Sequence, residues 1–401
     1  MTAARPPYRL ALVALAAGSL LTGLWAGLVR LGWVLPGAEL APNHGPLLIA
    51  GVLGLVIGLE RAVALGRPWA YAAPVTAGLG GLGLVLGLPL ATAAWLFIAS
   101  GLLVIAIFVQ VYRRRPESAS AVMGAGAVAW LTSNLLWLAG RATTELVPWW
   151  AAFLVLTIVG ERLELAQVLL PAPVRLALLG AAGVMAAGVV LSAVSLMPGV
   201  QVVGGGLLLL AIWLLRYDVA RRTIRRPGLA RFGAVCLLLG YVWLGLAGLV
   251  WLMGAAGFPG AFWYDAMVHS LFLGFVFSMI FGHAPTIIPA VTGIAVPYTR
   301  LFYLHVALLH GSLLVRIVGD VASSAEVRAW GGLANVLAIL VFAGLTVRAA
   351  FRPTGSPAAW VAPLDRTTGH FGSGERDRCH ALSAASGGTL SVRPTAPTGS
   401  H

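Results

Sequence analysis

Lysine is absent from this chain of 401 residues, and cysteine and charged residues of either sign are scarce. The two cysteines, Cys236 and Cys379, are too few and too scattered for a disulfide framework or a thiolate metal site. Charged residues make up 10% of the sequence, with 26 arginines against 13 acidic residues. Because the arginines cluster in short loops, the net charge of +13 does not indicate a nucleic-acid partner.

Hydrophobic residues, by contrast, make up 59% of the chain, in recurring apolar runs of about twenty residues. This pattern predicts an all-α polytopic membrane protein, a bundle of about twelve transmembrane helices in a lipid bilayer. The first segment lacks a small-residue cleavage site and continues as a full-length span, so we expect no removable signal peptide. The predicted spans are 10–31, 44–64, 69–89, 91–112, 119–140, 146–170, 174–196, 200–217, 231–253, 262–284, 300–319 and 328–350.

The arginines also predict the orientation of these spans. Seventeen lie in loops on the side of the amino terminus, against four on the opposite side. Short cytoplasmic loops carry the excess of basic residues, so both termini are predicted to be cytoplasmic, in the inner membrane of a bacterium. Residues 1–352 form the predicted transmembrane domain, and residues 353–401, rich in Ser, Thr, Gly, Pro and Arg, a predicted disordered tail.

Histidines inside predicted spans are the candidate functional residues. His269 and His283 lie fourteen residues apart in the tenth span, close to four whole α-helical turns, which predicts that both rings share one face about 21 Å apart. Ionisable groups in hydrocarbon are costly, so they mark functional sites by default. The alternative is that each histidine only forms a hydrogen bond with a neighbouring helix.

Depth along the spans separates an outer group from an inner one. The outer group is His44, His269 and Asp265, and two imidazoles on facing helices are what axial ligation of a haem requires. Asp265, one turn before His269, is predicted to accept the other N–H of that ring and fix its tautomer.

Two arginines lie near this outer group, Arg30 at the end of the first span and Arg316 at the end of the eleventh. Either could pair with the propionates of a haem. The alternatives are interfacial snorkelling for both, or for Arg316 an i,i+4 pair with Asp320.

The inner group has several interpretations. Its side chains suit copper, iron or zinc, and would equally suit a second haem or a proton pathway. The alternative is an interhelical network in which Arg61 or Arg162 neutralises the glutamates. The members of the group are His283, His305, His310, Glu161 and Glu164.

Two segments resemble a known family. NHGPLLIAGVLGLVIGLERAVALGRPW at 43–69 and HSLFLGFVFSMIFGHAP at 269–285 look like segments of the NnrS-like proteins, twelve-span membrane proteins distantly similar to the catalytic subunit of haem-copper oxidases. The resemblance implies an oxidase-like helical architecture, haem and copper as cofactors, and a role in the response to nitric oxide. In the oxidases, histidines on the second and tenth spans hold the low-spin haem, so it implies that His44 and His269 are an axial pair.

The sequence departs from the oxidases in ways that limit this implication. His269 is followed by Ser270 and Leu271 rather than by a second axial histidine, and the sixth and seventh spans have no histidine for copper. We therefore do not predict an oxidase, and whether the protein is an enzyme stays open. The leading hypothesis is a membrane protein that binds haem. If the inner group also binds a metal, the protein would hold a second metal centre. It would act with an electron-donor protein in electron transfer, or in the response to nitric oxide or redox stress. The rivals are a secondary transporter with buried His/Glu coupling residues and a haem-handling factor without turnover.

Overall fold

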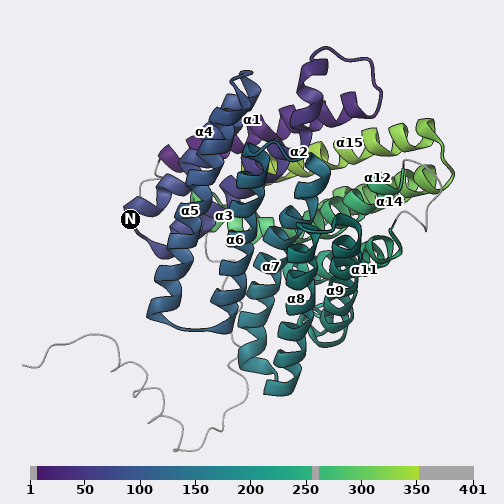
Figure 1. The fold of residues 1–401 in the computed structure, drawn as a ribbon. Coiled ribbons are helices and arrows are strands. Elements are labelled where there is room, and N and C mark those ends of the chain that lie inside the picture. The colour runs from purple at the N-terminus through teal and green to yellow at the C-terminus, as the bar shows by residue number, and fades with distance from the viewer. Residues whose placement is uncertain (1–6, 255–261, 352–401) are drawn as a thin grey trace, which may run out of the picture. The chain divides into compact units, whose positions relative to one another are not determined.

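A computed structural model of the chain describes residues 7–254 and 262–351, and their regular structure is entirely helical (Figure 1). Eleven of the helical segments in this part are long and apolar enough to cross a membrane. This confirms the prediction of an all-α polytopic membrane protein. The chain divides into residues 1–351 and 352–401, and the tail predicted at 353–401 lies outside the described residues.

The helices follow the predicted spans closely. Long helices are α1 (Pro7–Arg30), α5 (Leu90–Arg114), α6 (Ser118–Leu138), α7 (Thr143–Leu169), α8 (Ala172–Ser192), α9 (Leu196–Tyr217), α11 (Leu229–Met253), α14 (Phe302–Val321) and α15 (Ala325–Ala350). Two further segments combine short pieces, with π-helix in the middle of each. The first is η1 (Ala38–Asn43), α2 (His44–Pro46), η2 (Leu47–Gly54) and α3 (Leu55–Leu65), and the second is α12 (Trp263–His269), η5 (Ser270–Phe277) and α13 (Ser278–Thr292).

The segment predicted at 69–89 is shorter than expected. It contains a 3₁₀ turn, η3 (Pro68–Tyr71), followed by α4 (Ala72–Val85), which has 14 residues and is not among the eleven long apolar helices. Fourteen residues give a rise of about 21 Å, less than the hydrocarbon thickness of about 30 Å. The turn-forming Gly87, with φ +71°, ends the segment early.

The tenth predicted span differs from the prediction in two respects. It continues to Thr292 through Pro285 and Pro289, where the prediction ended it at 284, and stops at Gly293 with φ +72°. Its centre, Ser270–Phe277, is π-helix rather than α-helix. A π-turn holds more residues than an α-turn, so the fourteen residues between His269 and His283 are not four whole turns. The same-face prediction, which assumed a continuous α-helix, loses its basis.

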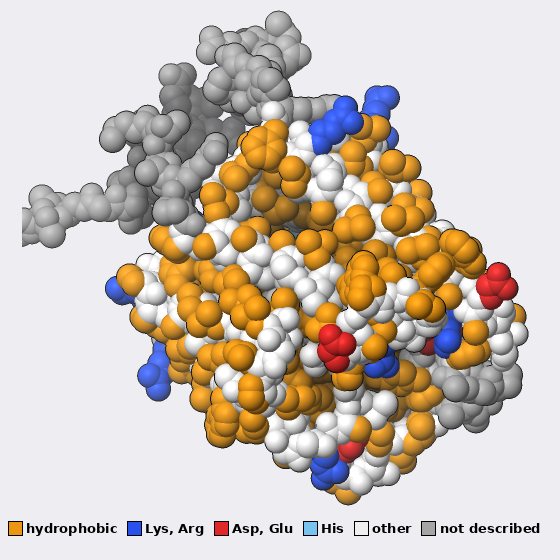
Figure 2. All heavy atoms as spheres, turned by 90° about the horizontal axis from the view of Figure 1, so that it is seen from above, with side chains coloured by type: hydrophobic (Ala, Val, Ile, Leu, Met, Phe, Trp, Pro, Cys, Tyr) orange, Lys and Arg blue, Asp and Glu red, His pale blue; other side chains and the backbone are white. Residues whose placement is uncertain are grey.

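Glycine allows the helices of the bundle to approach one another closely. A Cβ atom at Gly204 of α9 would overlap the backbone nitrogen of Leu252, and one at Gly248 of α11 would lie 2.6 Å from that of Leu208. Small residues at such crossings are typical of membrane helices, where close van der Waals contact drives association. Hydrophobic side chains dominate the face shown in Figure 2, with only scattered charged groups among them. That surface suits contact with lipid.

Candidate functional site

A cavity of about 300 Å³ opens at the end of the bundle where α2, α12 and the start of α7 meet. Its volume lies at the lower limit of small-molecule sites. Most of its lining is apolar, with Leu, Val, Ile and Phe side chains from α1, η2, η5 and α15. The polar side chains in the lining include Arg30, His44, Asp265, His269, Arg316, Arg328 and Asn335. All three members of the predicted outer group therefore line one cavity.

The rings of His44 and His269 lie beside each other in this cavity. Their centroids are 6.4 Å apart and their planes are inclined by 35°. One ring comes from the first residue of α2, the other from the last residue of α12, segments separated by more than two hundred residues of sequence. The structure thus brings together the two histidines that the sequence proposed as a pair.

Each ring is held through its Nδ1 atom by a backbone carbonyl. Nδ1 of His44 lies 2.7 Å from the oxygen of Gly23, and Nδ1 of His269 lies 2.9 Å from the oxygen of Asp265. Because a carbonyl can only accept, Nδ1 must carry the hydrogen in both rings. In a neutral imidazole this leaves the lone pair on Nε2. Within the described residues neither Nε2 atom forms a hydrogen bond, so two metal-binding lone pairs are free in one cavity.

A glycine on α1 makes room for the first ring. A Cβ atom at Gly27 would lie 2.7 Å from Cε1 of His44 and 2.8 Å from its Nδ1. Any larger residue would push the ring away from the carbonyl of Gly23, which lies one turn earlier on the same helix. Sequence reasoning missed Gly27, because one glycine among 50 carries no signal without the tertiary contact.

Both histidine-bearing helices change to π-helix beside the cavity. The π-segment η2 begins three residues after His44, and η5 begins directly after His269. π-Helical turns are rare and are found mainly at functional sites, where they redirect side chains. Their occurrence beside both histidines supports the assignment of this cavity as the functional site, and no sequence pattern indicated it.

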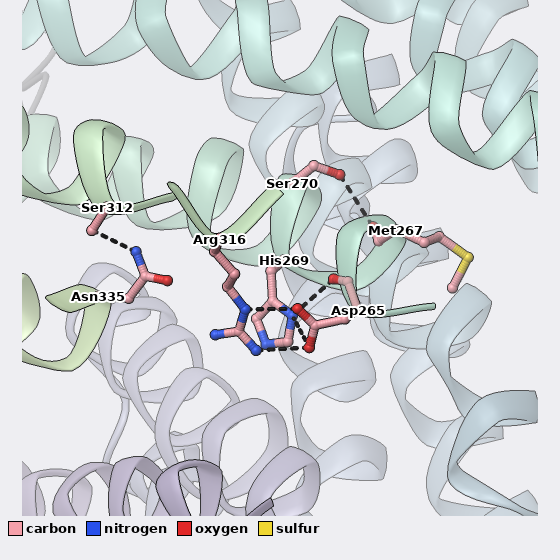
Figure 3. A network of polar contacts seen from close by, with 7 residues as sticks. All are labelled: Asp265, Met267, His269, Ser270, Ser312, Arg316 and Asn335. Carbon is pink, nitrogen blue, oxygen red and sulfur yellow. Dashed lines mark hydrogen bonds and ion pairs between the residues drawn. The ribbon is translucent and has the colours of Figure 1, made fainter. Parts of the chain in front are cut away.

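Asp265 joins His269 to α14 (Figure 3). The guanidinium group of Arg316 donates two hydrogen bonds to the carboxylate of Asp265, both 2.7 Å long. The carboxylate also lies 3.3 Å from Nδ1 of His269, further away than the backbone oxygen of the same residue. The carboxylate of Asp265 therefore lies close to the ring nitrogen, but the backbone carbonyl of Asp265, rather than the predicted carboxylate, accepts its hydrogen bond.

Among the arginines that line the cavity, Arg316 pairs with a carboxylate and the other two do not pair with one in the described part of the chain. Arg316 does not pair with Asp320, as one alternative had it, because Asp265 occupies its fork. Arg30 and Arg328 form no ion pair within the described residues. The Cζ atom of Arg328 instead lies 3.8 Å from the centre of the Phe262 ring. The cavity therefore combines two free imidazole nitrogens with two cations available to an anionic ligand.

In the inner group, the contacts of His283 differ from those of the outer histidines. Its Nδ1 donates to the oxygen of Met279 at 2.7 Å, and its Nε2 accepts a hydrogen bond of 2.9 Å from Arg162. Both ring nitrogens are therefore used by the protein itself.

The other inner residues are separated from one another by their own contacts. Glu161 forms an ion pair with Arg61, as the network interpretation suggested, whereas Glu164 is exposed and has no ion pair within the described residues. Nδ1 of His310 accepts a hydrogen bond of 2.8 Å from Trp243. His305 is 1% exposed, and the centre of its ring lies 4.6 Å from the centre of the Phe281 ring. Neither nitrogen of His305 has a hydrogen-bond partner in the described part of the chain.

The inner side chains are not gathered into a set of three metal ligands within the described residues. Among the described residues, no three His, Cys, Asp or Glu side chains are grouped in a way that could hold a metal ion. Copper binding by His283, His305, His310, Glu161 and Glu164 therefore stays a prediction, and we do not include it in the proposed function.

Comparison with known proteins addresses the bundle as a whole. No curated protein matches the chain significantly. One family model, described as a domain of unknown function (DUF8744), matches residues 9–351. The match covers nearly all of the described helices and includes every residue of the cavity. The chain therefore belongs to the DUF8744 family.

Proposed function

We propose that the cavity binds haem, with His44 and His269 as the two axial ligands, and that the protein is an electron-transfer or redox protein of the membrane. The spacing of the two rings is the observation that carries this proposal. A ring nitrogen binds a transition metal at about 2.0 Å and lies about 1 Å from its ring centre, so two imidazoles on opposite sides of one metal have centres about 6 Å apart. The observed separation is 6.4 Å.

The rest of the cavity suits a tetrapyrrole with two carboxylates. Its walls are apolar, and Arg30 and Arg328 lie in its lining without carboxylate partners in the described residues. Backbone carbonyls fix both tautomers, so each Nε2 is preorganised as a ligand. With both axial positions filled by imidazole, haem would supply one-electron transfer rather than binding of a gaseous substrate at open iron.

Other features support parts of this proposal. The resemblance to NnrS-like proteins favours a role in the response to nitric oxide, and the arginine distribution favours a bacterial inner membrane with both termini in the cytoplasm. An electron-donor protein is the expected partner. A transporter is less well supported, because the cavity that holds both His44 and His269 lies at one end of the bundle rather than at the midplane.

The absorption spectrum of the purified full-length protein tests the proposal. We expect about one haem per chain by pyridine haemochrome and a six-coordinate low-spin spectrum that carbon monoxide leaves unchanged. A protein that stays free of haem after expression with added haem, and after titration with hemin, would sink the proposal and favour the transporter. Haem binding without reduction by any quinol or protein donor would instead identify a haem-handling factor.

A further inference from the structure

A second hollow lies at the opposite end of α7 from the histidine cavity. Its volume is about 430 Å³. Trp150 of α7 lines the histidine cavity and Leu170, just after α7, lines this hollow, so the two are separated by about 30 Å along the helix axis. The lining residues besides Leu170 are Arg216, Tyr217, Asp218, Arg221, Arg222 and Arg225.

The hollow has a strong excess of positive charge. Its four arginines form no ion pair within the described residues, whereas Arg61, Arg115 and Arg141 elsewhere in the chain all pair with glutamates. The acidic side chain in the lining, Asp218, is 6% exposed, and its Oδ1 accepts a hydrogen bond of 2.8 Å from the backbone nitrogen of Ala220. Asp218 therefore serves the local turn rather than the arginines.

The protein itself fixes part of this arrangement. Arg221 donates a hydrogen bond of 2.7 Å to the backbone oxygen of Arg216, and the guanidinium group of Arg216 lies 5.1 Å from the ring centre of Tyr217. The short helix α10 (Ala220–Thr223) carries Arg221 and Arg222 back towards the end of α9. Membrane topology explains why arginines lie on this side of the bundle, but it does not require four of them to line one hollow.

An apolar strip continues from the basic hollow along α7. A smaller hollow of about 20 Å³ shares Leu170, Tyr217, Asp218 and Arg222 with it and extends to Leu165 and Leu169. These two leucines are 46% and 52% exposed on the outside of the bundle. A ligand that used the whole site would therefore have an anionic head and an apolar tail.

We propose that this site binds an anionic phospholipid. The phosphate lies among Arg216, Arg221, Arg222 and Arg225, and an acyl chain follows Leu165 and Leu169. Basic pockets at the ends of membrane helices are suited to phospholipid headgroups, because each arginine adds charge-assisted hydrogen bonds to a phosphate oxygen. The proposal does not depend on haem binding at the other end of the bundle.

Native mass spectrometry of the full-length protein in detergent tests the site. We expect phosphatidylglycerol to bind at least 10-fold more tightly than phosphatidylcholine with the same acyl chains. Each arginine near a headgroup contributes about fivefold in affinity, so Arg222→Gln with Arg225→Gln should weaken phosphatidylglycerol binding about 25-fold. The matched control is Arg113→Gln with Arg114→Gln, which removes two exposed arginines at the same end of the bundle but outside the hollow and should leave affinity unchanged.

Three results would overturn the proposal. Equal weakening in both double variants would show only a general attraction of the arginine-rich side for anions. Binding of glycerol phosphate as tight as that of phosphatidylglycerol would reassign the hollow to soluble phosphates. Equal affinity of the unaltered protein for the two phospholipids would contradict the proposal without any variant, so the test does not depend on the folding of the Arg222→Gln, Arg225→Gln protein.

Discussion

His269 and His283 lie on one continuous helical segment, α12–η5–α13, and differ chiefly in the surroundings of Nε2. Each ring has its Nδ1 within 2.9 Å of the carbonyl oxygen four residues earlier, Asp265 for one and Met279 for the other. The ring of His269 lines a cavity beside a second imidazole, and its Nε2 forms no hydrogen bond within the described residues, whereas Nε2 of His283 accepts a hydrogen bond from Arg162. The local bond is the same, and only the neighbouring helix makes one ring a candidate ligand and the other a structural link.

The strongest test of this comparison removes each ring in turn. We expect His269→Ala or His44→Ala to abolish the six-coordinate low-spin spectrum, because each deletes one of the two free Nε2 atoms. His283→Ala should keep that spectrum, since both nitrogens of His283 are already bonded within the protein. Absorption spectra and haem content of the three purified variants are the measurement. Normal haem and an unchanged spectrum in both outer variants would show that the outer cavity is not a haem site.

The next largest effect is expected when the space beside His44 is filled by a substitution at Gly27. Gly27→Ala should weaken haem binding by about 10- to 100-fold, because the new methyl group displaces His44 from the carbonyl that orients it. Gly18→Ala on the same helix is the matched control, since no atom lies within 4 Å of a Cβ there. Hemin titrations followed by absorbance compare the two variants. Equal affinities would show that the position of the His44 ring does not matter.

Loss of the hydrogen bond between Arg162 and His283 should reduce the stability of the protein rather than its haem binding. Arg162→Met removes the donor to Nε2 of His283 in a nearly buried position, and we expect it to lower the free energy of unfolding by about 1–3 kcal/mol. Arg114→Met, at an exposed site, should change it by less than about 0.5 kcal/mol. Denaturant unfolding in detergent measures both. A change in the haem spectrum of Arg162→Met would contradict the separation of the two regions.

The smallest expected effect concerns the reduction potential of a haem held by His44 and His269. Asp265→Asn should leave haem bound and raise its reduction potential by on the order of 60 mV, equal to a tenfold change in a one-electron equilibrium. The reason is that the variant loses a negative charge beside His269 and leaves Arg316 uncompensated, which favours the reduced iron. Redox titration of wild type and variant measures the shift, and an unchanged potential would limit Asp265 to a packing role.

Much of the fold could be predicted, because the length of an apolar segment can be read from the sequence without knowing which helices it packs against. Eleven of the predicted spans coincide with long apolar helices, and 69–89 differs because turn residues shorten α4. The outer pair was predictable in part, since His44 and His269 lie at similar depth by residue count alone. The NnrS-like resemblance and its oxidase-like arrangement stay predictions, as does the orientation in the membrane.

The sequence by itself determined which segments enter the bilayer and that an i−4 carbonyl lies near each histidine of α12–α13, because both depend only on neighbours along the chain. The tertiary structure alone decided which side chain of another helix lies beside each of these polar residues. Arg162 reaches His283, Arg61 reaches Glu161, and His44 reaches His269 across helices that are far apart in sequence. The π-helical turns also depend on packing between helices, since η2 and η5 each begin within three residues of a cavity histidine.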